Sequence, residues 1–292
     1  EAKKIIFKKV NIFNANDILD VFNNFGLTHL VNFAAESHVD RSIKNPSTFI
    51  NTNILGTYNL IEVFRKYYER NNSPHEFRFL QISTDEVYGS LEKEDNRFNE
   101  LSSYKPQSPY SASKASADHI VKAWGNTYDL PILISNCSNN YGPFHYPEKL
   151  IPLTITNILK GKEIPIYGNG SNIRDWLYVS DHCSALDCLL LNAKKGETFC
   201  IGGNSEYTNL NLVMKICLYV DQITKQKGIN LKIKPSSQLI NFVEDRKGHD
   251  FRYSISYKKI ENLLGWRPKI SIDEGLKLTI NWFLENRDWW DY

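Results

Sequence analysis

Two adjacent carboxylates, Asp85 and Glu86, follow Thr84 at the point where the apolar run of residues 77–83 stops. A short apolar run that ends in polar residues is typical of a buried strand. Two carboxyl groups held side by side can adopt different protonation states, so that one accepts a proton while the other donates one. The alternative is a pair of solvated loop acids, which is the usual situation for carboxylates at a strand end. The pair is therefore a candidate for general acid and base chemistry.

A tyrosine and a lysine four residues apart, Tyr110 and Lys114, occur in the segment YSASK. In a helix this spacing places both side chains on one face. An ammonium group beside a phenol lowers the phenol pKa from its reference value of about 10, so the pair can serve as base and acid for an alcohol or ketone. The spacing also arises by chance, with a half-buried tyrosine and a solvated lysine. The catalytic interpretation gains weight because Ser83 and Thr84 lie at a strand end just upstream.

Hydrophobic periodicity predicts the scaffold that positions these side chains. Strands are expected at residues 3–10, 28–35, 77–83 and 131–136, and helices at 14–26, 46–68 and 111–128. Asn14 or Asn16 can cap the first helix and Gly26 can end it. This alternation predicts an α/β fold with a parallel sheet covered by helices on both faces. Ligands bind at the carboxyl ends of such strands, which are residues 34–38, 83–86 and 136–141 here.

The sequence changes in character from about Pro143 onward, where Gly- and Pro-containing loops separate shorter helices. These helices are expected at residues 180–192, 209–225, 256–263 and 272–286. Such a region predicts a smaller C-terminal lobe that closes over the sheet ends and binds substrate. We therefore expect two domains, residues 1–142 and residues 143–292, with the first sharing some later elements.

Composition excludes several classes of partner. The 292 residues carry 35 Lys and Arg against 33 Asp and Glu, and this net charge of +2 gives no reason to expect nucleic acid. No apolar run approaches the roughly 18 residues of a membrane span, and the start lacks a secretory signal, so a cytoplasmic protein is expected. The five cysteines form no CxxC pair and are expected to be buried free thiols. No group of His, Cys or carboxylate residues has the spacing of a metal site, so we expect no metal.

The chain resembles the extended short-chain dehydrogenase/reductase family, most closely its dTDP-glucose 4,6-dehydratase branch. Seven segments carry the resemblance, in the family's order: FAAESHVDRSI, ISTDEVYG, YSASKASADH, NCSNNYGP, PEKLIPL, IYGNGSNIRDWLYVSDH and GWRP. It extends from about residue 4 to about residue 284, and the Thr-Asp-Glu triplet separates the dehydratases from the 4-epimerases. The resemblance implies a Rossmann-like fold and an NAD-dependent hydro-lyase that turns dTDP-glucose into its 4-keto-6-deoxy product. It also implies a place in deoxysugar biosynthesis such as the rhamnose pathway, and a homodimer formed through the helices at 46–68 and 111–128.

The resemblance assigns a role to each catalytic candidate. Tyr110 takes the proton of the C4 hydroxyl while hydride passes to NAD⁺, and Lys114 tunes Tyr110. The C4 ketone makes the C5 proton acidic, so that Glu86 can remove it. Asp85 then protonates the departing C6 hydroxyl, and Thr84 hydrogen-bonds the C4 oxygen.

The resemblance also implies two sets of binding residues. The expected NAD contacts are Asn11, Ile12, Ala34, Ala35, Thr52, Ser83, Tyr110, Lys114 and Cys137. The expected sugar-nucleotide contacts are His38, Thr84, Asn139, Lys149, Pro165, Tyr167, Arg174, Asn209, Arg246 and His249. The positive charges of Lys149, Arg174 and Arg246 suit a diphosphate.

Each of the two arginines also has an ordinary alternative, a surface ion pair of little energetic weight. The candidate partners are Asp175 or Asp181 for Arg174, and Glu244, Asp245 or Asp250 for Arg246. The segment RKGHD, residues 246–250, departs from the family pattern by carrying Lys247 in place of Pro. That change adds a positive charge near the expected diphosphate site and does not indicate a new substrate.

The family's first strand and its Gly-rich turn, Thr-Gly-x-x-Gly-x-x-Gly, do not occur in this sequence, which starts at what resembles the third strand. The expectation is therefore a nearly complete active centre with half of a dinucleotide site. Two alternatives remain: another sugar-nucleotide member of the family, such as an epimerase or decarboxylase, and a non-catalytic nucleotide-binding remnant. The base of the nucleotide, thymine or uracil, is left open.

Overall fold

The computed structural model describes residues 5–72 and 76–291. Helix α1 (Ala15–Phe25) forms where apolar residues recur at helical spacing, and it buries Ile18 and Phe22. The Asn14 side chain accepts hydrogen bonds from the backbone of Asn16 and Asp17, and Gly26 ends the helix at φ 57°. Glycine adopts this left-handed conformation at the lowest cost, so the predicted end at Gly26 is confirmed, and of the two candidate caps it is Asn14 that caps the helix.

The central sheet has four strands in the order β1-β2-β3-β7. They are β1 (His29–Asn32), β2 (Arg78–Thr84), β3 (Ile132–Cys137) and β7 (Thr198–Ile201). Strands β1 and β2 run parallel with Leu30 opposite Phe79. The strand expected at residues 3–10 is wrong for residues 5–10, which carry no strand, and residues 3 and 4 lie outside the described residues. No described strand pairs with the outer edge of β1, so this segment has no ladder to join.

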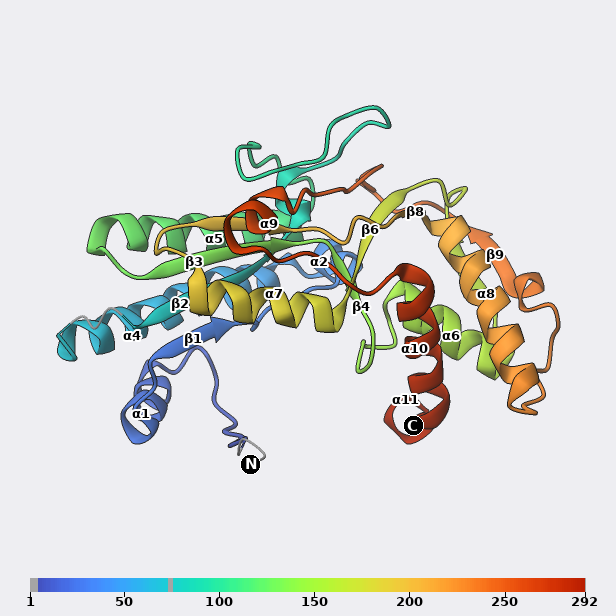
Figure 1. Cartoon of the computed structure of the whole chain (residues 1–292), viewed down its shortest axis with the longest axis horizontal. Coiled ribbons are helices and arrows are strands. Elements are labelled where there is room, and N and C mark those ends of the chain that lie inside the picture. The colour runs from blue at the N-terminus through green and yellow to red at the C-terminus, as the bar shows by residue number, and fades with distance from the viewer. Residues whose placement is uncertain (1–4, 73–75, 292) are drawn as a thin grey trace. The chain divides into compact units, whose positions relative to one another are not determined.

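The helices that accompany β2 and β3 enclose an apolar core (Figure 1). The helix predicted at 46–68 is helical throughout, but it comprises α3 (Pro46–Phe49), a π-helical turn (Ile50–Leu55) and α4 (Gly56–Arg70). Helix α5 (Pro109–Tyr128) starts with a capping box formed by Ser108 and Ser111. Its Val121 packs in one core with α1, α4 and alternate residues of β2 and β3. Packing in this core fixes the orientation of α5, whose N-terminal end carries Tyr110.

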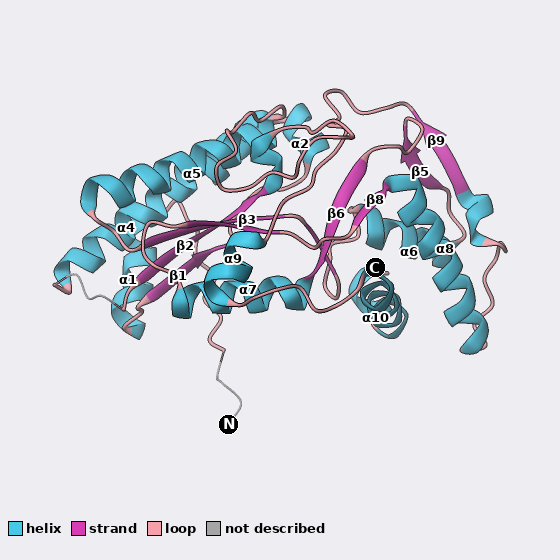
Figure 2. Ribbon diagram, turned by 45° about the horizontal axis from the view of Figure 1, so that its top comes forward, coloured by secondary structure: helices cyan, strands magenta, loops and turns pink. Residues whose placement is uncertain are grey.

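A second core lies among strands and helices from the later part of the chain (Figure 2). Strand β4 (Asn139–Tyr141) runs parallel to β6 (Ile173–Tyr178), which pairs antiparallel with β8 (Glu206–Thr208). Strand β5 (Ile164–Tyr167) runs parallel to β9 (Ile240–Val243). Helices α6 (Leu150–Lys160), α8 (Asn209–Gln226) and α10 (Ile272–Glu285) complete this core. Helix α6 and these five strands were not predicted from the sequence.

The remaining elements are short, apart from α7 (Val179–Asn192). They are α2 (Val39–Lys44), the 3₁₀ turns η2 (Asp85–Tyr88) and η3 (Ser236–Leu239), α9 (Lys258–Leu264) and α11 (Arg287–Trp290). The helices predicted at 180–192, 209–225, 256–263 and 272–286 are therefore confirmed within two residues as α7, α8, α9 and α10.

The chain divides into two compact units that alternate along the sequence. The first unit comprises Glu1–Ser83, Ser108–Ser135 and Asn192–Thr198, and the second comprises Thr84–Gln107, Asn136–Leu191 and Phe199–Tyr292. The expected functional division at residue 142 stays a prediction.

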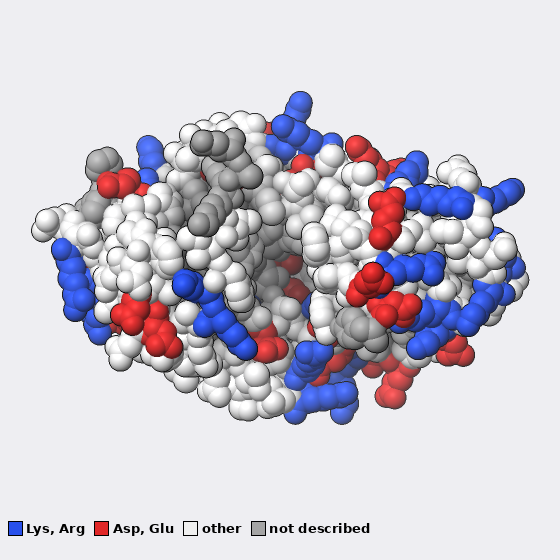
Figure 3. Space-filling model, turned by 90° about the horizontal axis from the view of Figure 1, so that it is seen from below, with Lys and Arg blue, Asp and Glu red and all other residues white. Residues whose placement is uncertain are grey.

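The surface and the thiols complete the description. Acidic and basic side chains both occur across the face drawn in Figure 3. Among the described residues, no helix is both long and apolar enough to cross a membrane. All five cysteines are free; Cys137, Cys200 and Cys217 are buried as expected, whereas Cys183 is exposed and Cys188 is half-buried. The exposed Cys183 contradicts the expectation of buried thiols, because its position on α7 faces solvent.

Candidate active site

The acidic pair stands where β2 passes into the turn η2, in the second unit. The Thr84 hydroxyl caps this turn by accepting a hydrogen bond from the Glu86 backbone N–H at 3.3 Å, and it donates to Asp85 Oδ1 at 3.3 Å. The carbonyl of Thr84 accepts from the Asn136 side chain at 3.3 Å. Asp85 is 1% exposed, so the structure does not place it as a solvated loop acid.

The two carboxyls have different electrostatic surroundings. Burial raises the pKa of Asp85 well above its ordinary value, and the negative charges of Glu86 and Asp175 raise it further. Burial also raises the pKa of Glu86, but the nearby charges of Arg174 and Lys149 act in the opposite direction. The pKa of each carboxyl is therefore raised, but the negative charges of Glu86 and Asp175 add to the rise at Asp85, whereas the positive charges of Arg174 and Lys149 oppose it at Glu86. Paired carboxyl groups that share acid and base work differ in their surroundings in this way.

Among the positive charges around Glu86, that of Arg174 on β6 lowers the Glu86 pKa the most. Its guanidinium donates to the backbone carbonyls of Ile173, Phe251 and Asp250 and lies over the Tyr253 ring, 4.2 Å from the ring centre. The alternative that Arg174 forms an ion pair with Asp175 or Asp181 is wrong. Both aspartates accept backbone N–H donors instead, Asp175 from Gly203 and Ser205 and Asp181 from Lys269 and Ile270.

Asp175 is a functional candidate that the sequence reasoning considered only as an ion-pair partner. It is completely buried, and Gly203 donates to its Oδ2 at 2.8 Å while Ser205 donates to its Oδ1 at 2.6 Å. Its charge contributes to the raised pKa of Asp85. The sequence carried no signal for this role, because neighbouring residues of a strand point to opposite faces and Asp175 follows Arg174 directly on β6.

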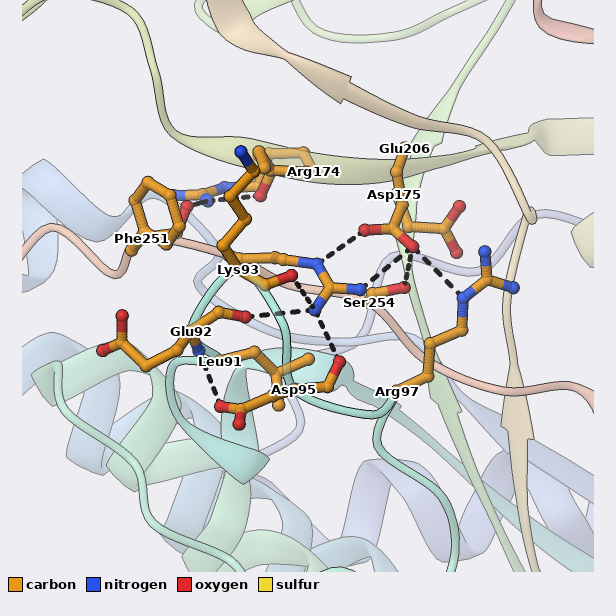
Figure 4. A network of polar contacts seen from close by, with 12 residues as sticks. Leu91, Glu92, Lys93, Asp95, Arg97, Arg174, Asp175, Glu206, Phe251 and Ser254 are labelled. Atoms are coloured by element: carbon orange, nitrogen blue, oxygen red, sulfur yellow. Dashed lines mark hydrogen bonds and ion pairs between the residues drawn. The ribbon is translucent and has the colours of Figure 1, made fainter.

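A polar network braces the strands behind this cluster (Figure 4). Arg252 donates to Glu206 Oε2 at 2.7 Å and to the carbonyls of Glu92 and Asp95 at 3.1 and 2.8 Å. Arg97 donates to Glu206 Oε1 at 3.1 Å. The network joins β8 to the segment that follows η2, and so supports the turn that carries the two carboxyls.

A second polar cluster lies near the β5 and β9 pair. The Arg246 guanidinium lies 5.1 Å from the centre of the Tyr167 ring, and the His249 ring meets Tyr167 edge-on at 6.0 Å. His249 Nδ1 lies 2.7 Å from Asp245 Oδ1. Pro165 is two residues from Tyr167 on β5. The structure thus brings four expected substrate-binding residues, Pro165, Tyr167, Arg246 and His249, into one neighbourhood, with Asp245 beside them.

Three more expected substrate residues occupy element ends in the second unit. Lys149 precedes α6, Asn139 begins β4 and Asn209 begins α8. The side-chain oxygens of Asn139 and Asn209 are buried with no hydrogen-bond partner among the described residues. Buried amide oxygens are normally satisfied, so both positions fit groups that receive a donor from a ligand.

The tyrosine–lysine pair lies on α5 in the first unit. Tyr110 is 8% exposed and meets Phe49 edge-on, with ring centres 6.3 Å apart. Lys114 is 5% exposed, and its ammonium donates to the carbonyl of Ile82 at 2.6 Å. The alternative of a solvated lysine is therefore wrong, because the ammonium is held at the carboxyl end of β2.

Most of the expected cofactor residues also belong to the first unit. Ala34 and Ala35 follow the end of β1, Thr52 lies in the π-helical turn, and Ser83 is at the end of β2. Ile12 packs against α4, where a Cβ on Gly56 would lie 2.4 Å from its Cδ1. Two expected residues lie near the ends of these elements: Asn11 precedes α1 and is exposed, and His38 precedes α2. Cys137 ends β3 and belongs to the second unit.

These residues suit a dinucleotide chemically. Small side chains after β1 leave the backbone accessible, and Ser83, Tyr110 and Lys114 supply hydroxyl and ammonium groups at the carboxyl end of β2, where open α/β sheets bind such ligands. Within residues 5–72 and 76–291, no group of three or more His, Cys, Asp or Glu residues is arranged to hold a metal ion.

The fold and the site define an α/β enzyme of the Rossmann type with two adjacent carboxyl groups at the end of a central strand. Residues 1–279 match the family described as GDP-mannose 4,6 dehydratase, and the chain belongs to that family. It is 48% identical to the dTDP-glucose 4,6-dehydratase of Neisseria meningitidis serogroup B over 286 residues, which are 97% of this chain and 80% of that protein. It is 47% identical to the Salmonella typhimurium dTDP-glucose 4,6-dehydratase over 299 residues, 99% of this chain and 81% of that protein.

A solved structure agrees with these relatives. The chain superposes on DesIV, the dTDP-glucose 4,6-dehydratase of Streptomyces venezuelae, crystallised with NAD bound, at a TM-score of 0.84 and 40% identity. The superposition covers 97% of this chain and 80% of DesIV. The expected fold class is thereby confirmed.

Proposed function

We propose that this protein is an NAD-dependent hydro-lyase that converts dTDP-glucose to dTDP-4-keto-6-deoxy-glucose. The observation that carries the proposal is the pair of adjacent carboxyls in different electrostatic surroundings: the charges of Glu86 and Asp175 raise the pKa of Asp85, whereas those of Arg174 and Lys149 oppose the rise at Glu86. An epimerase needs no such pair, because it breaks no C–O bond. Relatives named dTDP-glucose 4,6-dehydratase support the same function.

The chain's own groups divide the reaction into proton transfers. Tyr110, with Lys114 one helical turn further along α5, accepts the proton of the C4 hydroxyl, and Thr84 hydrogen-bonds the C4 oxygen. The resulting C4 ketone acidifies the C5 proton, which Glu86 removes. Asp85, held protonated by burial, donates its proton to the C6 oxygen so that water leaves. Carboxyls of equal pKa would perform only one of these transfers well.

NAD would supply the acceptor for the C4 hydride and the donor of the same hydride to C6, and Glu86 would return its proton to C5 as the hydride arrives, so that no net oxidation results. The residues that would hold it are Asn11, Ile12, Ala34, Ala35, Thr52, Ser83, Tyr110, Lys114 and Cys137. DesIV, crystallised with NAD, supports this assignment.

The sugar nucleotide would be held mainly by groups of the second unit. Lys149, Arg174 and Arg246 supply charge for the diphosphate, and Tyr167 offers a ring to the base. Asn139 and Asn209 would donate or accept through side chains whose oxygens are buried. Thr84, Pro165, His249 and His38 complete the proposed set.

The cellular setting follows from the same proposal. Free thiols at all five cysteines suit a reducing compartment, so we place the enzyme in the cytoplasm, within deoxysugar biosynthesis such as the rhamnose pathway. We propose a homodimer formed through the helical segments at 46–68 and 109–128. These segments expose large apolar side chains that a partner copy would cover: Ile50, Leu55, Tyr58 and Tyr128. Sedimentation of the purified chain tests this assembly, and a monomer at micromolar concentration contradicts it.

The first experiment is an assay of the mass-verified 292-residue chain with dTDP-glucose and added NAD⁺. The product is detected by the alkali-induced absorbance of a 4-keto-6-deoxy sugar. UDP-glucose in a parallel reaction tests the choice of base. Absence of product from both substrates, in a chain that binds NAD⁺ and dTDP, overturns the proposed function.

A further inference from the structure

One buried carboxylate of the first unit, Asp118, has no role in the proposed reaction. It lies on α5 and is 2% exposed. Tyr110, Lys114 and Asp118 follow one another at intervals of four residues, so they lie along one face of the helix. All three are buried, at 8%, 5% and 2% exposure. An acidic residue, Asp118, therefore lies one helical turn beyond the tyrosine–lysine pair.

Asp118 and Lys114 both form hydrogen bonds with the end of β2. Ser83 Oγ donates to Asp118 Oδ2 at 2.5 Å, and Lys114 Nζ donates to the Ile82 carbonyl at 2.6 Å. Ile82 and Ser83 are neighbours in the chain, so two successive residues of β2 are held by two successive turns of α5. The ammonium and the carboxylate are in this way both bonded to the end of β2.

The bond to Asp118 decides what Ser83 can do. A serine hydroxyl has a single O–H donor and two acceptor lone pairs. Because the donor is directed to Asp118, Ser83 can only accept a hydrogen bond from any other group. A buried carboxylate is costly unless it is bonded and faces positive charge, and Lys114 on the same helix face provides that charge.

We propose that Asp118 is a positioning residue for the Tyr110–Lys114 pair: it balances the Lys114 charge, fixes Ser83 as an acceptor and thereby sets the acidity of Tyr110. This role rests on the proposed function, because it concerns the base at C4. The Asp118 charge opposes that of Lys114, so it prevents Tyr110 from being permanently ionised. A phenol that is neither fully protonated nor fully ionised can take up a proton in one half of the cycle and return it in the other.

The other charges around α5 in this unit come from two of the elements packed against it, α2 and α4. Helix α3 and the π-helical turn carry no ionisable side chain, and α2 carries Asp40, Arg41 and Lys44. Helix α4 carries Glu62, Arg65, Lys66, Glu69 and Arg70. Glu62 accepts a hydrogen bond from Trp124, nearly three turns beyond Lys114, and the Arg65 guanidinium lies over the Tyr128 ring at the end of α5. Substitution of Asp118 leaves all of these groups in place.

The test is a direct titration of Tyr110 in the full chain. The 16 tyrosines are labelled with ¹³C at Cζ, and Tyr110 is assigned by the signal lost in Tyr110→Phe. Asp118→Asn is expected to lower the pKa of Tyr110 by about one unit, the effect of a unit charge about 12 Å away at an effective dielectric constant of about 20. Asp118→Leu, which is similar in size and apolar, serves as a second neutral variant if Asp118→Asn fails to fold.

Asp129→Asn is the matched control, because it removes the same charge from the end of the same helix. Asp129 is exposed with φ 51°, a conformation that asparagine accepts. Its variant is expected to titrate Tyr110 like the parent. An unchanged Tyr110 titration in the neutral Asp118 variants overturns the proposal and shows a purely structural role.

A kinetic measurement separates this proposal from the function it rests on. With NAD⁺ and dTDP-glucose, the pH of half-maximal NADH formation is expected to fall by about one unit in Asp118→Asn and to stay unchanged in Asp129→Asn. A parent chain without turnover counts against the proposed function, while the ¹³C titration still decides the role of Asp118.

Discussion

The guanidinium of Arg174 lies 4.2 Å from the centre of the Tyr253 ring, and its charge lowers the pKa of Glu86 against the raising effect of burial. Three backbone carbonyls hold the guanidinium in this position. A base at this site has to be ionised, so Arg174 extends the range of pH in which Glu86 works.

Replacement of Arg174 should therefore change the pH profile. In Arg174→Gln the pKa of Glu86 rises, and the acid limb of kcat moves to higher pH by about one unit, as expected for the loss of one close charge. The measurement is the rate of product formation between pH 5 and 9. Arg267→Gln, which removes an exposed charge in the same unit, should keep the parent profile. If the acid limb does not move in Arg174→Gln, the charge of Arg174 does not lower the pKa of Glu86.

Substitution of the two carboxyls should separate oxidation from dehydration. Asp85→Asn and Glu86→Gln each keep the shape of the side chain and remove one proton transfer, so elimination slows by about 10²- to 10⁴-fold. Oxidation at C4 depends on other groups and is expected to continue. Absorbance at 340 nm in a single turnover should then show NADH that accumulates, with little 4-keto-6-deoxy product. Full turnover by both variants would falsify the roles proposed for the pair.

Stability should fall in mild acid because a buried histidine has to remain neutral. Burial lowers the pKa of His182 from 6.5 to about 4. Between these values the unfolded chain binds the proton and the folded chain does not, so stability is lost as pH falls through this window. His182→Leu has no titrating group at this position. Between pH 7 and pH 5 its free energy of unfolding should fall by about 2 kcal/mol less than that of the parent.

Urea unfolding followed by circular dichroism at the two pH values measures this difference. Leu191→Ala, at an exposed position with no titratable group, provides the control and should show the parent's pH dependence. If the free energy of unfolding falls equally in His182→Leu and the parent, this histidine does not contribute to the pH dependence of stability.

The aromatic C-terminus should be important for stability. Trp290 is 5% exposed, its Nε1 donates to the Phe283 carbonyl at 2.8 Å, and the Lys160 ammonium lies 5.1 Å from its ring centre. Trp290→Ala leaves a large cavity in the second core and should cost about 3–5 kcal/mol in urea unfolding. Leu191→Ala, at a position that is 80% exposed, should change stability by less than about 0.5 kcal/mol. A Trp290→Ala chain as stable as the parent would mean that the C-terminal segment does not pack as described.

Local sequence was sufficient wherever neighbouring residues decide the structure. The spacing of Ile18 and Phe22 predicted α1, with its end at Gly26 and its start after Asn14 or Asn16, because caps and periodicity act within a few residues. The strand ending at Ser83 and Thr84 and the helix beginning near Tyr110 were predictable for the same reason. Residues 5–10 were predicted wrongly, because a strand also requires a partner and sequence pattern alone does not supply one.

The sequence by itself determined the α/β alternation, the carboxyl pair, the tyrosine–lysine spacing and the resemblance that pointed to a dehydratase. Only the tertiary structure decided that Asp85 is buried beside Asp175, that Arg174 bonds carbonyls instead of either aspartate, and that Asp118 bonds Ser83. These contacts join residues 35 to 90 positions apart in the chain, and they depend on how strands and helices pack. Burial and long-range charge set the acidity of a carboxyl group, and neither is a property of its sequence neighbours.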